Sequence, residues 1–250
     1  MSVDEPFRID GRRALVTGAN TGIGQACALS LAERGAHVVA AGRSSCDETV
    51  RRIEAAGGSA EAVHLDLADP AAAAARLAGF GMLDILVNNA GIIRRADAVD
   101  HGEEDWDAVL DVNLKAVFLL SQAFARAALA RGAGGRIVNI ASVLTFQGGI
   151  RVPAYTASKH GVAGLTKALA NEWAKDGITV NAVAPGYVVT NNTAALRDDP
   201  QRSAEILERI PAGRWGEPSD IGGAVAFLCL PAAGYVTGTV LSVDGGWLAR

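Results

Sequence analysis

Cysteine is scarce in this chain of 250 residues, which has three of them: Cys27, Cys46 and Cys229. An odd number of widely spaced cysteines excludes a disulfide framework and the paired spacing of a zinc site. The four histidines are equally scattered, at positions 37, 64, 101 and 160. We therefore expect no metal site, and we expect the three thiols to be small buried side chains in a reducing compartment.

The chain also lacks an excess of basic residues, a signal peptide and a membrane-spanning run. Its formal net charge is −4, without a basic stripe, so nucleic acid is not expected as a partner. Residues 1–6 are acidic and polar, unlike the start of a signal peptide. No uninterrupted apolar run reaches the ~20 residues that cross a bilayer. The composition therefore predicts a cytoplasmic protein that does not bind membranes.

What the sequence does contain is an alternation of short apolar runs and longer helical patterns. The apolar runs are continuous, as in strands that helices cover on both faces; they predict strands at residues 13–17, 37–41, 60–65, 83–87, 136–140, 179–183 and 239–243. Helical periodicity predicts helices at residues 23–33, 47–56, 70–78, 105–130, 153–175, 199–209 and 219–228. This order is typical of an α/β fold with a Rossmann-type, doubly wound parallel sheet of about seven strands.

The chain has no linker rich in proline, glycine or serine, so we expect a single domain over residues 1–250. Residues 187–218 are polar, charged and partly helical. Long excursions of this kind often cover a site, and we expect this segment to form a small lid.

A glycine-rich turn follows the first predicted strand and precedes the first predicted helix. Gly18 permits a tight turn, Gly22 lets the backbone approach a pyrophosphate, and Gly24 lets the helix pack close to the strand. The diphosphate then faces free N–H groups and the positive end of the helix dipole. The turn predicts dinucleotide binding, with a flexible turn as the alternative, and its candidate residues are Gly18, Asn20, Thr21, Gly22, Ile23 and Gly24.

Three other predicted strands end in residues suited to a nucleotide. Asp66 can accept a hydrogen bond from an adenine amino group. Small residues at 89–91 allow the backbone to approach the cofactor, and Thr190 lies near the expected position of the carboxamide of the cofactor. Ligands of open α/β sheets bind at this carboxyl edge. The candidates are Asp66 and Leu67 after the third strand, Asn89, Ala90 and Gly91 after the fourth, and Pro185, Gly186, Val188 and Thr190 after the sixth.

The turn after the second predicted strand distinguishes NAD from NADP. A carboxylate at that turn binds the ribose 2′-hydroxyl, whereas an arginine accommodates a 2′-phosphate. This chain has Arg43 there and no carboxylate. We therefore predict NADP as the cofactor, with NAD as the alternative, in which Arg43 stacks on the adenine or is solvated.

Tyr155 and Lys159 stand four residues apart in a predicted helix, so their side chains lie on one face. A free phenol has a pKa of about 10 and is a poor base near neutral pH. A cation within roughly 4–6 Å lowers that pKa. We interpret the pair as an acid/base device in which Lys159 lowers the pKa of Tyr155; the alternative is a half-exposed tyrosine beside a solvated lysine.

Taken together, these motifs resemble the short-chain dehydrogenase/reductase family over essentially the whole chain. The resemblance implies that Tyr155 is the acid/base, that Ser142 hydrogen-bonds the reacting oxygen, and that Lys159 also holds the nicotinamide ribose. It further implies that Asn113 supports a water-mediated proton path to Lys159. The expected reaction is hydride transfer between the cofactor and a carbinol carbon. The matching residues are the glycine-rich turn, residues 88–91, Asn113, Ser142, Tyr155, Lys159, Pro185 and Gly186.

Several local stretches are similar to the branch of this family that acts on sugar acids of the gluconate and deoxygluconate type. They are residues 92–95, 146–153, 191–193, 202–207, 209–216 and 244–250. A sugar acid carries a carboxylate and several hydroxyls, so its site needs a cation with amide or hydroxyl partners. Arg94, Gln147 and Arg151 are the candidates. A surface or subunit-interface ion pair is the alternative for either arginine.

Two other functions stay open on the sequence alone. One is a 3-oxoacyl carrier-protein reductase, which uses the same catalytic residues and needs a basic surface near the site for its acidic carrier. The other is a non-catalytic, dinucleotide-sensing protein, against which the intact Ser142, Tyr155 and Lys159 argue. The resemblance also implies a homotetramer in which helices 105–130 and 153–175 pack between subunits, although core packing explains their apolar faces as well.

Overall fold

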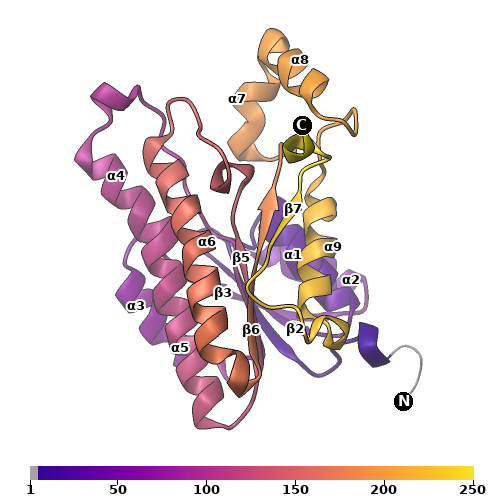
Figure 1. Ribbon diagram of the computed structural model, residues 1–250. Coiled ribbons are helices and arrows are strands. Elements are labelled where there is room, and N and C mark those ends of the chain that lie inside the picture. Colours follow the sequence, from indigo (N-terminus) through magenta and orange to yellow (C-terminus); the bar gives the residue numbers. More distant parts are fainter. Residues whose placement is uncertain (1–4) are drawn as a thin grey trace.

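A computed structural model describes residues 5–250, which form a seven-stranded sheet (Figure 1). The strands are β1 (Arg13–Thr17), β2 (His37–Gly42), β3 (Ser59–His64), β4 (Ile85–Asn88), β5 (Gly135–Ile140), β6 (Ile178–Pro185) and β7 (Val240–Val243). All neighbours are parallel, in the order β3-β2-β1-β4-β5-β6-β7. The order reverses between β1 and β4, and such a switch point opens a crevice at the carboxyl ends of the strands.

Helices cover both faces of the sheet, which confirms the predicted doubly wound fold (Figure 1). One face carries α1 (Gly22–Glu33), α2 (Asp47–Ala55) and α9 (Pro218–Cys229). The other carries α3 (Pro70–Ala75), α4 (Glu103–Leu110), α5 (Ala116–Ala130) and α6 (Pro153–Trp173). Two further helices, α7 (Ala194–Arg197) and α8 (Pro200–Arg209), stand above the carboxyl ends of the strands.

The central strands supply side chains to two separate cores, which explains why these strands are mostly apolar. On β1, Ala14 and Val16 pack toward α1 and α9, whereas Leu15 between them packs toward α5 and α6. Successive side chains of a strand point to opposite faces, so a strand covered on both sides has no solvent-facing position for a polar residue. The position at the end of β1, Thr17, is buried as well.

Two predicted helices differ from the observed ones. The stretch predicted at 105–130 is divided by a π-helical turn at Asp111–Lys115, and the stretch predicted at 70–78 ends at Ala75 and continues as a 3-10 helix, Arg76–Phe80. A π-turn inserts one residue into a helix, and periodicity does not reveal it. Such turns occur frequently at functional sites, and here the turn buries Asn113.

Within residues 5–250, Glu103–Ala130 is the one helical stretch long and apolar enough to cross a membrane, judged by length and composition. It lies along the sheet, where Val117, Leu120 and Phe124 are buried. Packing in the core of the domain therefore accounts for the buried part of its apolar surface.

The predicted lid segment, residues 187–218, includes α7 and α8 at the carboxyl edge of the sheet (Figure 1). An apolar cluster joins it to the rest of the chain: Val143, Ile206, Ile210 and Trp247. Arg250 also donates hydrogen bonds to the carbonyl oxygens of Glu208, at 2.6 Å, and Arg209, at 3.2 Å. A cation at these last carbonyls stabilises the end of α8. The position suits a lid, and its opening stays a prediction.

Candidate active site

The glycine-rich turn joins β1 to α1 at the switch point of the sheet. Gly18 and Gly22 have positive φ angles of 65° and 56°, a region that favours glycine. A Cβ atom at Gly24 would lie 2.1 Å from the carbonyl oxygen of Gly18 and 2.4 Å from Nδ2 of Asn89. The backbone is therefore so closely packed that residue 24 has no room for a side chain.

Asn89 and Thr17 stabilise this turn through hydrogen bonds. Nδ2 of Asn89 donates to the carbonyl oxygens of Thr17, at 2.9 Å, and Gly18, at 3.3 Å. In return, Oγ1 of Thr17 accepts hydrogen bonds from the backbone N–H groups of Asn89, at 3.0 Å, and Ala90, at 3.1 Å. The ends of β1 and β4 are thus joined through side chains. Thr17 was not among the predicted site residues; its signal is a hydroxyl at the end of an otherwise apolar strand.

The first turn of α1 carries backbone N–H groups that have no acceptor within the helix itself. Its N-cap residue, Thr21, makes no capping hydrogen bond with its side chain. A Cβ at Gly22 would lie 3.5 Å from Cγ2 of Thr190, so the turn faces the segment that follows β6. A diphosphate fits such a place, because helix N-termini bind anions and only glycine leaves the backbone this open.

The other predicted cofactor residues also lie along the carboxyl edge. Arg43 is exposed directly after β2, Leu67 is buried beyond β3, and Oδ1 of Asp66 accepts a hydrogen bond from the N–H of Ala68 at 3.0 Å. A Cβ at Gly186 would lie 2.7 Å from Cα of Asp244. The remaining members of the set lie at the end of β6 or follow β1, β4 and β6: Pro185, Asn20, Ile23, Ala90, Gly91 and Val188. The structure brings the whole set to one edge, and the contact each makes with a cofactor stays a prediction.

Tyr155 and Lys159 lie on the same face of α6, as the spacing predicts. The ammonium nitrogen of Lys159 is 5.5 Å from the centre of the Tyr155 ring. Lys159 is 4% exposed, and its ammonium donates a 2.5 Å hydrogen bond to the carbonyl oxygen of Ile140, the last residue of β5. The strand therefore positions this buried cation beneath the phenol.

Ser142 follows β5 and begins a short 3-10 turn. Its Oγ accepts a hydrogen bond from the N–H of Leu144 at 3.1 Å. A hydroxyl that accepts this bond keeps its own proton for another partner. The same turn contacts α6, because Oγ1 of Thr145 donates to the carbonyl oxygen of Lys159 at 3.1 Å. Ser142, Tyr155 and Lys159 are therefore held together by the β5–α6 connection.

Asn113 lies in the π-turn and is almost fully buried. Its Oδ1 accepts from the N–H of Ile92 at 2.8 Å, and its Nδ2 donates to the carbonyl oxygen of Ile92 at 2.9 Å and to Oγ of Ser158 at 3.3 Å. The side chain thereby fixes the loop after β4 against α6. A role in a water-mediated proton path stays a prediction.

In the protein alone the pKa of Tyr155 is raised, not lowered, and a lowering by Lys159 in the cofactor-bound site stays a prediction. Burial raises the pKa of the Tyr155 phenol, opposed by a hydrogen bond with Ser142 and by the charge of Arg95. Burial also lowers the pKa of Lys159 to about 8. Desolvation disfavours the charged form of both groups. The spacing in the sequence predicts that the two side chains share one face of a helix, but it does not predict how deeply that face is buried.

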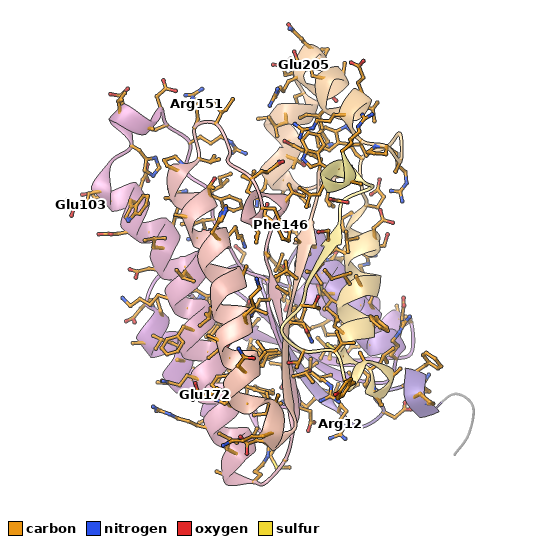
Figure 2. The ribbon with its side chains drawn as sticks, viewed as in Figure 1. Arg12, Glu103, Phe146, Arg151, Glu172 and Glu205 are labelled. Carbon is orange, nitrogen blue, oxygen red and sulfur yellow. The ribbon has the colours of Figure 1, made fainter. Side chains whose placement is uncertain are left out.

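The two predicted substrate arginines are each paired with a carboxylate. Nε of Arg94 lies 3.0 Å from Oδ1 of Asp105, and Nε of Arg151 lies 3.1 Å from Oδ1 of Asp97. Arg151 stands at the same end of the molecule as the lid (Figure 2). Gln147 is partly buried in the loop after Ser142. Substrate binding by these three residues stays a prediction, and the ion pairs favour the alternative for both arginines.

Arg95 is a residue that the sequence analysis missed as a candidate. Its guanidinium donates a 3.0 Å hydrogen bond to the carbonyl oxygen of Asn192 in the lid segment, and its charge acts on Tyr155. In the described part of the chain, Arg95 has no carboxylate partner. Its neighbour Arg94 has one. The signal available in the sequence was the pair of adjacent arginines, which does not say which one faces the cleft.

The fold and this site define a class of protein, the oxidoreductases that use a nicotinamide dinucleotide. The crevice suits a diphosphate, and a serine, a tyrosine and a lysine meet at its edge. No cluster of three or more His, Cys, Asp or Glu side chains is placed to hold a metal ion within residues 5–250.

Comparison with known proteins agrees with this class. A family model described as enoyl-(acyl carrier protein) reductase matches residues 18–248. A 2-dehydro-3-deoxy-D-gluconate 5-dehydrogenase of Escherichia coli (strain K12) is 54% identical over 248 residues, which cover 98% of each chain. The chain belongs to the short-chain dehydrogenase/reductase family, as the motifs indicated.

Two solved structures are similar over nearly the whole chain. A protein of Agrobacterium tumefaciens described as a 2-deoxy-D-gluconate 3-dehydrogenase, with bound NADP, has a TM-score of 0.96 and 63% identity, covering 98% of this chain and 99% of its own. A gluconate 5-dehydrogenase from Burkholderia cenocepacia J2315, in complex with NADP and tartrate, has a TM-score of 0.91 and 42% identity, covering 98% of each chain.

We predict that Gly24→Ala weakens NADP binding at least tenfold, because the added methyl group forces apart the glycine-rich turn and Asn89. Tenfold corresponds to ~1.4 kcal/mol. Calorimetric titration with NADP measures the effect. Gly223→Ala is the matched control, since Gly223 is also helical and a Cβ there would meet nothing within 4 Å. Equal affinities for both variants would contradict the role of the turn.

The buried lysine predicts a pH dependence of stability. Its pKa is lowered from 10.5 to about 8 in the folded protein, so the unfolded chain binds more protons between these values. The free energy of unfolding should therefore rise with pH in this window, relative to Lys159→Met, by on the order of 1.4 kcal/mol per pH unit. Urea unfolding of both proteins without cofactor at pH 8, 9 and 10 tests this, and a constant difference would rule it out.

Proposed function

We propose that this enzyme interconverts a secondary alcohol and a ketone on a sugar acid of the gluconate or deoxygluconate type, with NADP as its cofactor. The observation that carries the proposal is the buried Lys159 beneath Tyr155, with the charge of Arg95 acting on the same phenol. Similarity to sugar-acid dehydrogenases over 98% of the chain supports the choice of substrate class.

When bound, NADP supplies or accepts the hydride. The chain's own residues then manage the charge on the reacting oxygen. Ser142 donates a hydrogen bond to that oxygen, and Tyr155 gives or takes its proton. Lys159 keeps a positive charge near the phenolate form of Tyr155, in a site where little water competes. Thr17, Asn89 and Asn113 are positioning residues for the turn and loops around the cofactor.

Arg95 is our candidate for binding the carboxylate of the substrate. A carboxylate and a guanidinium form strong, directional pairs of hydrogen bonds. The guanidinium of Arg95 contacts only a backbone carbonyl in the described chain, at Asn192, whereas those of Arg94 and Arg151 already face carboxylates. An anion bound to Arg95 would lie between the loop after β4 and the lid.

The preference for NADP rests on Arg43. This side chain is exposed at the carboxyl end of β2, and the turn it belongs to has no carboxylate before Asp47. A guanidinium in that place suits a 2′-phosphate. The NADP bound to two similar proteins supports the same preference.

We further propose a cytoplasmic homotetramer. Aromatic side chains are exposed on the helices that the sequence analysis placed between subunits: Trp106 on α4 and Phe118 on α5. Phe227 on α9 and Tyr235 beyond it are exposed as well. Large apolar residues of this kind are often covered by another subunit.

A substrate panel tests the proposed activity. We expect gluconate, 2-deoxygluconate or the corresponding ketones to change the absorbance of reduced nicotinamide, with a higher kcat/KM for NADP than for NAD. Tyr155→Phe should lower kcat about 10³-fold because it removes the exchangeable proton, while NADP still binds. Turnover of a 3-oxoacyl thioester without any sugar acid would favour the carrier-protein reductase, and near-normal activity of the variant would remove Tyr155 from its role.

Replacing Arg95 tests carboxylate recognition. We predict that Arg95→Gln raises KM for the sugar acid at least tenfold, because a neutral amide forms weaker bonds to a carboxylate, and changes KM for an uncharged ketone far less. Arg94→Gln is the matched control, since Arg94 is adjacent and already paired with Asp105. Steady-state kinetics on both substrates gives the comparison. If the two variants behave alike, Arg95 does not hold the carboxylate.

A further inference from the structure

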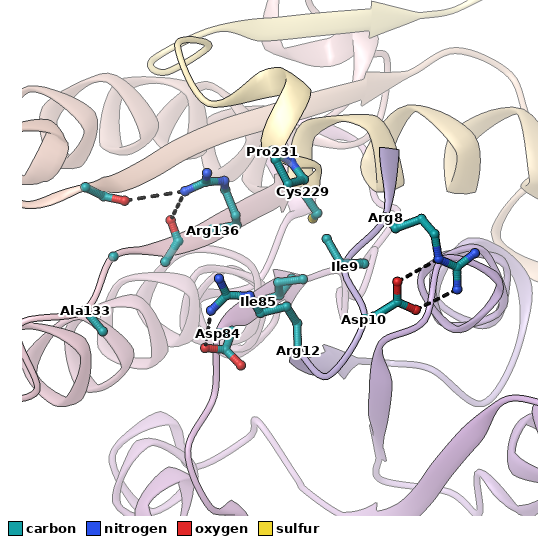
Figure 3. Close-up of a pocket in the computed structure, with 13 residues that line it drawn as sticks. Arg8, Ile9, Asp10, Arg12, Asp84, Ile85, Ala133, Arg136, Cys229 and Pro231 are labelled. Atoms are coloured by element: carbon teal, nitrogen blue, oxygen red, sulfur yellow. Dashed lines mark hydrogen bonds and ion pairs between the residues drawn. The ribbon is translucent and has the colours of Figure 1, made fainter. Parts of the chain in front are cut away.

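A cavity of about 640 Å³ lies at the amino ends of β4 and β5 (Figure 3). Tyr155 belongs to the opposite, carboxyl edge of the sheet. Arg12, which lines the cavity, stands at the far end of the molecule from Phe146 and Arg151 (Figure 2). Charged side chains dominate its walls: Arg8, Asp10, Arg12, Asp84 and Arg136. A volume of this size is in the range of small-molecule sites.

Arg136, near the start of β5, is a cation without a carboxylate partner among residues 5–250. Its Nη1 donates to the backbone carbonyl oxygens of Gly135, at 3.0 Å, and Gly177, at 3.4 Å. Its Nε is buried and, within the described chain, has no hydrogen-bond partner. Burial lowers the pKa of Arg136, and the charge of Arg12 lowers it as well. Within the described part of the chain, the cavity therefore contains a guanidinium that no carboxylate pairs with.

The two carboxylates of the cavity are already engaged. Asp10 is 2.6 Å from Arg8, and Asp84 is 3.3 Å from Arg12 while its other oxygen accepts from the N–H of Arg13 at 3.0 Å. Among residues 5–250, neither carboxylate pairs with Arg136. The distance from Arg12 to Asp84 is long for a charged pair, so Arg12 has donors available for another acceptor.

We propose that this cavity binds a small oxyanion, carried by a phosphorylated or carboxylated metabolite, between Arg12 and Arg136. Such an anion balances the unpaired charge and accepts hydrogen bonds from two guanidinium groups, which are suited to phosphate and carboxylate alike. Ile140 lies four residues after Arg136 on β5. At the rise of a strand, roughly 13 Å therefore separate Arg136 in the cavity from the carbonyl group of Ile140 that accepts the hydrogen bond of Lys159. The ligand and NADP therefore occupy separate sites and bind together.

Thermal unfolding of the full chain with saturating NADP tests this proposal. The probes are inorganic phosphate and citrate, each titrated at constant ionic strength against sodium chloride. We expect either or both to raise the Tm of the unmodified protein beyond the effect of chloride. A response to phosphate alone assigns a phosphorylated ligand, and a response to citrate alone assigns a carboxylated one. No response to either would overturn the proposal.

Variants locate the binding. Arg136→Gln should weaken the response at least fivefold, and Arg12→Gln, at an exposed position, should do the same. Arg126→Gln removes an exposed charge from α5, away from the cavity, and should leave the response unchanged. Equal Tm responses to the anion in all three variants would contradict binding between Arg12 and Arg136. Dissociation of an oligomer by Arg12→Glu would instead assign this face to a second copy of the chain and also overturn it.

Discussion

The hydrogen bond from the ammonium of Lys159 to the carbonyl oxygen of Ile140 is the contact on which the active site depends. It joins the end of β5 to the second turn of α6 across 2.5 Å, with almost no exposure to water. A buried cation is costly unless it finds acceptors, so the pairing fixes both the helix and the strand end. Tyr155 and Ser142 take their places from these two elements. The relative positions of Ser142, Tyr155 and Lys159 therefore depend on β5 ending at Ile140.

Burial, and not only the short distance between Tyr155 and Lys159, determines the pKa values of these two side chains. The protein alone raises the pKa of Tyr155 and lowers that of Lys159, so each group is pushed toward its neutral form. An acid/base tyrosine then needs positive charge from its surroundings. The guanidinium of Arg95 contributes positive charge, and the oxidised form of a nicotinamide ring carries a further positive charge. On this account, proton exchange by Tyr155 depends on whether the cofactor is bound.

The sequence predicted most of the fold because the central strands are buried on both faces and the helices between them have clear ends. All seven strands fall within about two residues of their expected bounds. The π-turn at Asp111–Lys115 was missed, since one inserted residue leaves the apolar periodicity almost unchanged. Of the site, the catalytic residues came together as expected. Periodicity did not reveal that Arg94 pairs with Asp105, eleven positions away, while Arg95 donates to the carbonyl oxygen of Asn192 in the lid segment.

The most direct test of this account is a measurement of the pKa of Tyr155 by NMR, using tyrosine labelled with ¹³C at Cζ; the chain has three tyrosines, so assignment by substitution is simple. We predict that Tyr155 titrates above the usual value of about 10 in the protein alone and at a lower pH once NADP⁺ is bound. A Tyr155 that titrates below that value without cofactor, or whose titration NADP⁺ does not change, would contradict the account.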